Sequence, residues 1–478
     1  MKFSFINPGP NEELSYDEKQ KMIGACIPLG ILYIATVLRE KGIEVSVLDQ
    51  AAGSLSVKET ANWIKKENPN VLGFSTLTTS NRTAVILAKE AKIENPNLIT
   101  VFGNYHATFN ANRILENYPF VDIIVRGEGE NTCVELAEYL KRKQNLKHVL
   151  GITYRNENGI ISTQDRPLIQ NINSLPIPDR KLVDIEYHNA TAGINVAPKK
   201  FTTVLSSRGC VFGCRFCGCT QLSRNLWRPR TVENILEELA FLTSDGYKQF
   251  MFVDDNFTLN QSRVIDLCNE IRRQKIDMEW ICEGRVDRCS RDLLKAISSA
   301  GCKMLYFGIE SGNQHILDYY KKNITPEQSK RTVKLARECG IDVIVGSFIL
   351  GAPNESREDI GNTLQFAESL DLDIPQFNIL GAFPGIDIWD ELVARGILDP
   401  NFYWETGAIV ADIYPNSVPS NEIRDTIRRS YKNFLLRPRY IMEEMLLSSR
   451  SSYRLNVMLN NLSRIKAISK ALKGIGVR

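Results

Sequence analysis

The chain has no long hydrophobic run. None of its 478 residues lies in an apolar stretch that approaches the roughly eighteen residues of a membrane-spanning helix. The first residues, Met1-Lys-Phe-Ser-Phe-Ile-Asn-Pro8, also lack the pattern of a secretory signal peptide. These absences lead us to expect a cytoplasmic protein that folds without crossing a membrane.

Histidine is scarce and the overall charge is small. There are four histidines, and the formal net charge is +3, so the composition does not suggest a nucleic-acid partner. The charge is unevenly placed, however. Residues 421–478 contain thirteen Lys and Arg against four Asp and Glu, a balance of +9, which leaves 3 − 9 = −6 for the residues before them. The basic excess therefore lies in the C-terminal segment.

The eleven cysteines do not suggest disulfides. The number is odd and the chain is long, which favours a reducing compartment where cysteines serve as ligands or as buried apolar residues. Five later cysteines have no ligand spacing, and we interpret them as core residues: Cys268, Cys282, Cys289, Cys302 and Cys339.

Three cysteines stand apart, in the stretch Cys210-Val-Phe-Gly-Cys214-Arg-Phe-Cys217 after an apolar run. Thiolates at this spacing can hold one iron-sulfur cluster, and three ligands for a four-iron cube leave one iron open to a substrate or cofactor. Two alternatives are a zinc knuckle with Cys219 as fourth ligand and plain buried thiols. We expect the cluster.

The CxxxCxxC spacing with Phe216 before the third cysteine resembles the signature of the radical S-adenosylmethionine (SAM) superfamily. The resemblance implies a catalytic [4Fe-4S] cluster bound by Cys210, Cys214 and Cys217. It also implies that the open iron chelates the amino and carboxylate groups of SAM. Cys219 receives no role from it.

Residues 1–145 alternate short apolar runs with helical patterns, which is typical of an α/β, doubly wound, Rossmann-like domain with a parallel sheet. The expected strands are 2–6, 44–48, 71–75, 98–102 and 121–125. In such sheets ligands bind at the carboxyl ends of the strands, so the turns there are the places to search for function.

Four segments near those strand ends are Pro28-Leu-Gly30, Ser75-x-Leu77, the glycine turn before His106 and Gly127-Glu-Gly-Glu130. Together they resemble the cobalamin-binding domain of radical SAM enzymes, although each alone could be an ordinary glycine turn. The cobalamin contacts that the resemblance implies are Ser75, Leu77, Gly103, Asn104, His106, Ala107, Gly127, Glu128 and Glu130.

The cobalt ligand is left open. Asn7-Pro-Gly-Pro-Asn-Glu12 replaces the Asp-x-His-x-x-Gly run of domains that ligate cobalt through histidine, so a lower histidine ligand is not supported. His106 could hydrogen-bond to the corrin, serve the structure alone, or bind cobalt directly.

Residues 146–200 read as a linker with a hairpin near 154–159, and residues 201–400 as six strand–helix units that suit a partial (βα)6, TIM-like radical SAM barrel. The expected strands are 203–206, 249–253, 278–282, 303–308, 342–350 and 376–380. Charged residues at their carboxyl ends, individually ordinary loop charges, could together hold the zwitterionic end of SAM. The SAM contacts implied by the resemblance are Phe216, Asp255, Arg285, Glu310, Ser311 and Gly351.

Residues 401–478 should form a basic helical region with a helix over 422–436. Apolar residues then recur every three or four positions from Leu455 to Leu472, with Lys and Arg between them. This amphipathic segment either packs on the barrel or makes a peripheral contact with an anionic membrane.

The resemblance implies reductive cleavage of SAM to a 5′-deoxyadenosyl radical and, through methylcobalamin, methylation of an unactivated carbon of a hydrophobic small molecule. Flavodoxin or ferredoxin should donate the electron. One alternative is radical ring closure or rearrangement of a lipid or tetrapyrrole without methylation. Another is a cobalamin-binding sensor with a structural cluster.

Overall fold

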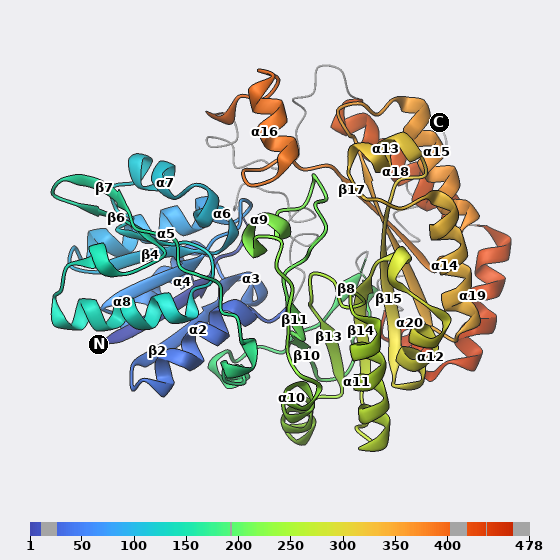
Figure 1. The fold of residues 1–478 in the computed structure, drawn as a ribbon, viewed down its shortest axis with the longest axis horizontal. Helices are drawn as coiled ribbons and strands as arrows, with labels where there is room; N and C mark the ends of the chain where they lie inside the picture. Colours follow the sequence, from blue (N-terminus) through green and yellow to red (C-terminus); the bar gives the residue numbers. More distant parts are fainter. Residues whose placement is uncertain (11–25, 192–193, 402–417, 436, 462–478) are drawn as a thin grey trace. The chain divides into compact units, whose positions relative to one another are not determined.

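The computed structural model describes residues 1–10, 26–191, 194–401, 418–435 and 437–461 (Figure 1). These form two compact units. The first is Met1–Tyr187 with Phe383–Gly385 and a short stretch from Asp399, and the second holds the remaining described residues from His188. Across the described residues we find no helix with the length and apolar character needed to span a bilayer.

The first unit is built on a seven-stranded sheet of order β2-β1-β3-β4-β5-β6-β7. The parallel strands are β1 (Lys2–Asn7), β2 (Glu44–Asp49), β3 (Val71–Ser75), β4 (Ile99–Gly103) and β5 (Ile123–Val125). The predicted hairpin forms β6 (Ile152–Asn156) and β7 (Gly159–Ser162). It does not stand apart in a linker, because β6 pairs antiparallel with β5 and extends this sheet.

Helices pack around this sheet. The apolar sides of α4 (Val57–Glu67), α5 (Asn81–Glu94) and α7 (Ala111–Asn117) share one core with β1, β3 and β4. Helices α2 (Leu29–Glu40) and α8 (Glu130–Arg142) pack against each other. Short helices α3 (Gln50–Gly53) and α6 (Asn104–Phe109) follow β2 and β4 directly. The doubly wound α/β fold is confirmed.

The second unit contains six parallel strands in the order β10-β13-β14-β15-β16-β17. Their bounds are β10 Phe201–Val204, β13 Gln249–Phe252, β14 Glu279–Gly284, β15 Cys302–Glu310, β16 Val343–Leu350 and β17 Ile374–Ile379. The main core joins them to α10 (Val232–Ser244), α11 (Gln261–Arg273), α12 (Arg291–Ser299), α14 (Pro326–Glu338) and α15 (Arg357–Ser369). Shorter helices are α9 (Cys219–Ser223), α13 (Gln314–Tyr319) and α16 (Asp387–Ala394). This is the expected partial barrel.

Local sequence sets several of these helix starts. Thr325 and Gln328 form a capping box in front of α14, with Pro326 at its first turn, and Ser356 with Asp359 does the same for α15. Each box satisfies backbone N–H groups that the first helical turn leaves without partners. Each helix therefore begins at a defined residue.

The described residues from 418 to 461 form three helices: α18 (Ser420–Leu435), α19 (Pro438–Arg450) and α20 (Ser452–Asn460). The predicted helix over 422–436 is α18. The sequence Arg437-Pro-Arg-Tyr440, which we expect to interrupt the helical pattern, starts a second helix, because Pro438 sits in the first turn, where proline is tolerated. Of the predicted amphipathic run, Leu455 to Asn460 lies in α20. The basic residues Arg464, Lys466, Lys470 and Lys473 lie outside the described residues.

Helix α20 closes the amino-terminal end of the barrel. Tyr453 is 2% exposed and packs in a small core with Ile281, Met304 and Val345 from three strands. Its hydroxyl donates a 2.8 Å hydrogen bond to the carbonyl of Val196. The short hairpin of β8 (Ala190–Thr191) and β9 (Ile194–Asn195) lies beside it, and the Asn195 N–H donates to the Asn461 side chain at 2.9 Å.

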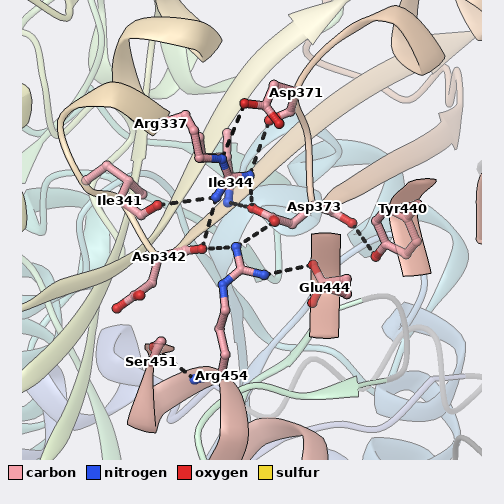
Figure 2. Close-up of polar contacts among 10 residues, drawn as sticks. All are labelled: Arg337, Ile341, Asp342, Ile344, Asp371, Asp373, Tyr440, Glu444, Ser451 and Arg454. Atoms are coloured by element: carbon pink, nitrogen blue, oxygen red, sulfur yellow. Dashed lines mark hydrogen bonds and ion pairs between the residues drawn. The ribbon is translucent and has the colours of Figure 1, made fainter. Parts of the chain in front are cut away.

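A buried polar network attaches α19 and α20 to the strands (Figure 2). The Arg454 guanidinium is 5% exposed and pairs with the Asp373 carboxylate at 2.6 Å and with Glu444 of α19 at 2.7 Å. Asp373 also pairs with Arg337 at 2.7 Å, and its carbonyl accepts a 2.9 Å hydrogen bond from Tyr440. Nearly every charge in the network is compensated, which is the condition for burying it.

Replacing Arg454 by Ala should destabilise the second unit by about 3 kcal/mol, because the buried Asp373 carboxylate would lose one of its two cationic partners. Hydrogen–deuterium exchange of β16 and β17 peptides across a urea series measures the change. The matched control is Arg450→Ala, which removes an exposed arginine four positions earlier. Equal protection in the two variants would contradict the assignment.

Candidate functional site

The cysteine loop is closed at its base by a short antiparallel pair. Strand β11 (Ser207–Arg208) pairs with β12 (Arg228–Pro229), so residues 209–227 form a loop that leaves and re-enters the barrel at one place. Gly209 begins it with φ +91°, and a Cβ there would lie 2.0 Å from the carbonyl oxygen of Leu226. Only glycine fits this position.

Two adjacent aspartates after β13 accept hydrogen bonds from the start of the loop. The Asp254 carboxylate, 3% exposed, accepts hydrogen bonds from the backbone N–H of Ser206 and from the hydroxyls of Ser206 and Ser207. The exposed Asp255 accepts the N–H of Gly209 at 2.8 Å. Asp254 is thus a positioning residue, while Asp255 is accessible as well as anchored.

The three predicted cluster ligands are half-buried free thiols. Burial raises the pKa values of Cys210 and Cys214, and for Cys214 the positive charges of Lys322 and Arg285 act in the opposite direction. The cationic groups favour thiolate, the form that binds iron. The net pKa of both thiols is nevertheless raised, so iron binding must displace their protons.

Cys219, to which the sequence assigned no role, contacts the third thiol. Its side chain and its backbone N–H both hydrogen-bond to Cys217, and this lowers the pKa of Cys217 to about 7. The same contact raises the pKa of Cys219, which keeps its proton. The structure thus favours Cys219 as a hydrogen-bond donor to a ligand.

Arg285 follows β14 and lies against the loop. Its guanidinium stacks on the Phe212 ring at 3.8 Å and places Nη1 3.8 Å from the Cys214 sulfur. It also pairs with Asp287 at 2.9 Å and donates to the carbonyl of Lys322 at 2.6 Å. Arg285 is 6% exposed, so its position is largely fixed.

Glu310, at the end of β15, forms a buried ion pair with Lys322. A Cβ on Gly308 would lie 2.6 Å from the Glu310 carboxylate and 2.7 Å from the Lys322 ammonium, so glycine makes room for the pair. Phe216 packs edge-on against Tyr320, with ring centroids 5.1 Å apart. Lys322 Nζ lies 5.8 Å from the Phe216 ring, which links the ion pair to the cysteine loop.

The other two predicted SAM contacts have structural partners. Ser311 is fully buried, and its hydroxyl lies 3.0 Å from that of Thr363. Gly351 has φ +91° and donates its N–H to the buried Glu355 carboxylate. Burial raises the pKa of Glu355 to about 7. The serine hydroxyl is engaged, whereas the glycine shapes a backbone turn.

Two residues at this rim were missed by the sequence argument. Lys322 follows a short helix and carries no motif, and only the fold brings it to Glu310. The second is Glu283, one residue before the end of β14. Desolvation by the surrounding protein, together with the carboxylates of Asp255 and Glu310, raises its pKa. Its place at the carboxyl end of a barrel strand, where barrel enzymes carry their active-site residues, was the sequence signal that could have identified it.

In the first unit, hydrogen bonds join the carboxyl ends of three strands. Asn104, with φ +76°, donates from its side chain to the Ser75 hydroxyl at 2.8 Å. Its carbonyl accepts from Thr108 at 2.8 Å, and the Thr108 hydroxyl accepts the N–H of Gly127 at 3.1 Å. Leu77 is 49% exposed beside this row. An exposed apolar side chain and open glycine backbone suit the approach of a large flat ligand.

The remaining predicted cobalamin contacts do not join this row. His106, Ala107 and Glu130 are buried, and the Glu128 carboxylate accepts the N–H of Ile169 at 2.7 Å. His106 Nδ1 lies 3.1 Å from the Thr78 hydroxyl. Burial, with the charge of Arg113, lowers the pKa of His106 to about 4, so the ring is neutral near pH 7.

Comparisons with known proteins agree with both units. Residues 21–137 match the B12 binding domain model, and residues 204–367 match the Radical SAM superfamily model. An uncharacterized methyltransferase, PH0819, of Pyrococcus horikoshii is 35% identical, over 87% of this chain and 90% of the relative. The chain belongs to the cobalamin-binding radical SAM enzymes.

Two further similarities extend this assignment. The anaerobic magnesium-protoporphyrin IX monomethyl ester cyclase of Cereibacter sphaeroides is 25% identical, over 91% of this chain and 71% of the relative. The fold matches that of the radical SAM methyltransferase TsrM from Kitasatospora setae, solved with cobalamin and a [4Fe-4S] cluster, with a TM-score of 0.66 at 18% identity over 82% of this chain and 75% of that one. The prediction of a radical SAM enzyme that uses a [4Fe-4S] cluster, SAM and cobalamin is confirmed at the level of the family.

The donors in the cysteine loop of this radical SAM enzyme suit an iron-sulfur cluster. Among the described residues, no group of three or more His, Cys, Asp or Glu side chains is disposed to hold one metal ion. Three thiolates of a cluster bind three different iron atoms and need not converge on one point. The donor set is also thiolate alone, which suits iron-sulfur chemistry.

Replacing Cys210, Cys214 or Cys217 by Ala should abolish cluster loading, because a cluster held by three thiolates loses a required ligand. Iron and sulfide content and visible absorbance after anaerobic reconstitution measure this. Cys219→Ser is the matched control and should load fully, since a hydroxyl can still donate to Cys217. Full loading of all three alanine variants would contradict the ligand assignment.

The depressed pKa of His106 predicts a pH dependence. The folded protein holds this ring neutral down to about pH 4, whereas an unfolded chain protonates it near pH 6.5. The contribution of the neutral His106 ring to the free energy of unfolding is therefore fully present above pH 6.5. It is lost as the pH falls toward 4, by about 2 kcal/mol between pH 7 and 5. Hydrogen exchange of the first unit in urea should show this loss reduced in His106→Gln. The His188→Gln variant, which changes an exposed histidine, should show the same loss as the unchanged protein. An equal dependence of unfolding free energy on pH in all three proteins would contradict the role of His106.

Proposed function

We propose that this protein is a methyltransferase that cleaves SAM to a 5′-deoxyadenosyl radical and methylates an unactivated carbon of a hydrophobic small molecule. The observation that supports the proposal most directly is the three-thiol loop held beside a charged barrel rim in a chain whose other unit matches the B12 binding domain model. When bound, the cluster supplies the electron for SAM cleavage, and cobalamin carries the methyl group.

The chain's own residues hold and orient SAM in this proposal. Asp255 and Glu310 provide carboxylates for the SAM amino group, and Arg285, lying against Cys214, provides the guanidinium for its carboxylate. Phe216 and the backbone at Gly351 shape the adenosyl side. Because Glu310 is already paired with Lys322, the site binds a zwitterion without leaving a buried charge uncompensated.

In the first unit, we propose that the Ser75–Asn104–Gly127 row and Leu77 contact cobalamin directly. The buried residues His106, Ala107 and Glu130 stabilise the same turns without contacting the ligand. The neutral His106 ring is held on Thr78, which favours a structural or hydrogen-bonding role over cobalt ligation.

A second candidate is radical ring closure or rearrangement of a tetrapyrrole or lipid without methyl transfer. The similarity to the magnesium-protoporphyrin ester cyclase, which spans 91% of this chain, supports this second candidate. The two candidates share SAM cleavage and differ in where the SAM methyl group goes.

We also propose flavodoxin or ferredoxin as the electron donor, and a cytoplasmic location with peripheral membrane contact near the C-terminus. The eleven cysteines are all free thiols, which fits a reducing compartment. The charge of +9 over residues 421–478 supports the contact with an anionic surface.

Anaerobic, reduced protein loaded with cluster and cobalamin should release 5′-deoxyadenosine from methyl-labelled SAM in the presence of a mixed lipid and tetrapyrrole extract. Mass spectrometry of the extract then locates the label. Label in an extract component supports methylation, and 5′-deoxyadenosine with unlabelled product supports ring closure. Cys214→Ala should lose both 5′-deoxyadenosine release and product formation, and Cys219→Ser should keep 5′-deoxyadenosine release. Absence of 5′-deoxyadenosine from the unchanged protein would refute both candidates.

A further inference from the structure

Helices α19 and α20 each present an apolar stripe to solvent. On α19 the exposed side chains are Met442 (60%), Met445 (69%) and Leu446 (53%). On α20 they are Leu455 (41%), Met458 (38%) and Leu459 (50%). Both sets follow the spacing i, i+3, i+4, so each forms one face of its helix. We call these six residues the methionine-leucine face.

The opposite sides of the same helices are fixed to the barrel. Tyr440 and Glu444 of α19 and Arg454 of α20 make the contacts of the network in Figure 2, and Tyr453 of α20 packs at the amino-terminal end of the barrel. At 100° per residue, these barrel-facing positions centre on the side of each helix opposite its exposed stripe. Neither helix can roll to bury its stripe without breaking the Arg454–Glu444 pair.

The two helices are also packed against each other, so their stripes belong to one hairpin. Six large apolar side chains on one hairpin differ from singly scattered exposed residues, which need no explanation. Methionine is common on surfaces that adapt to irregular partners. The face therefore has the character of a binding surface.

Charge decides between the possible partners. Arg424, Arg429 and Lys432 on α18 and Arg450 at the end of α19 are exposed. The acidic residues of α18 are already paired, Glu422 with Arg357 at 2.7 Å and Asp425 with Arg428 at 3.0 Å. Residues 421–478 together carry +9. A second copy of this chain would bring a like charge, whereas an anionic bilayer offers the opposite charge and an apolar interior.

We propose that the methionine-leucine face of α19 and α20 inserts into the headgroup boundary of an anionic lipid bilayer, with exposed basic residues of the C-terminal helices contacting lipid phosphates. The proposal gives the peripheral membrane contact a defined surface. It rests on that contact and not on the radical chemistry, because vesicle binding needs neither SAM nor reductant.

The test is co-sedimentation of the full-length protein with vesicles of phosphatidylcholine alone or mixed with phosphatidylglycerol. We expect at least tenfold tighter binding to the mixed vesicles and weaker binding at high salt. The triple variant Met445→Gln, Leu446→Gln, Leu459→Gln should bind mixed vesicles at least tenfold more weakly. The matched control, Ile86→Gln with Ile93→Gln, removes two exposed apolar residues of α5 and should bind like the unchanged protein.

Thermal unfolding of each variant checks that the fold is retained. Absence of binding to mixed vesicles, or equal binding by the triple variant, would overturn the proposal. So would a stable dimer of the unchanged protein that the triple variant converts to monomers, since the face would then be occupied by a second copy. A failure in any of these measurements leaves SAM cleavage, measured separately, unaffected.

Discussion

The hydrogen bonds between Asp254 and the Ser206–Ser207 turn are the contact on which the site in the barrel depends. They tie the carboxyl end of β13 to the segment that leads out of β10, and the neighbouring Asp255 holds the N–H of Gly209. Burial raises the pKa of Asp254, and three hydrogen bonds from Ser206 and Ser207 reduce this rise by favouring the carboxylate. The cysteine loop thus starts from a fixed point, although it is itself irregular.

Charges of both signs surround the loop. Lys322 and Arg285 lie near the Cys214 thiol and favour its thiolate, whereas the negative charge of Asp255 opposes ionisation of Cys210 and Cys217. Desolvation and the negative charges of Asp255 and Glu310 raise the pKa of Glu283. The carboxylates suit an ammonium group and the guanidinium of Arg285 suits a carboxylate, so one rim can bind a zwitterion. The Glu310–Lys322 pair keeps the buried charge balanced.

The C-terminal helices show how one segment can serve both the interior and the surface. Arg454 and Tyr453 fill the amino-terminal end of the barrel, away from the strand ends that carry the cysteine loop. The next residue, Leu455, faces solvent. A helix places neighbouring residues about 100° apart, so a sequence with two apolar-rich faces can pack one and expose the other. The barrel floor thereby fixes the orientation of the exposed methionine-leucine face.

Much of this architecture could be predicted because it is local. Apolar runs of strand length between helical patterns indicate two parallel α/β units, and the spacing of Cys210, Cys214 and Cys217 within eight residues indicates a cluster without any knowledge of distant contacts. The pairing of Lys322 with Glu310, the donation from Cys219 to Cys217 and the burial of His106 and Ser311 depend on which surfaces meet. Pattern alone places a residue at a strand end. Packing in three dimensions decided whether its side chain is free to bind, because hydrogen-bond partners and desolvation come from residues far away in the chain.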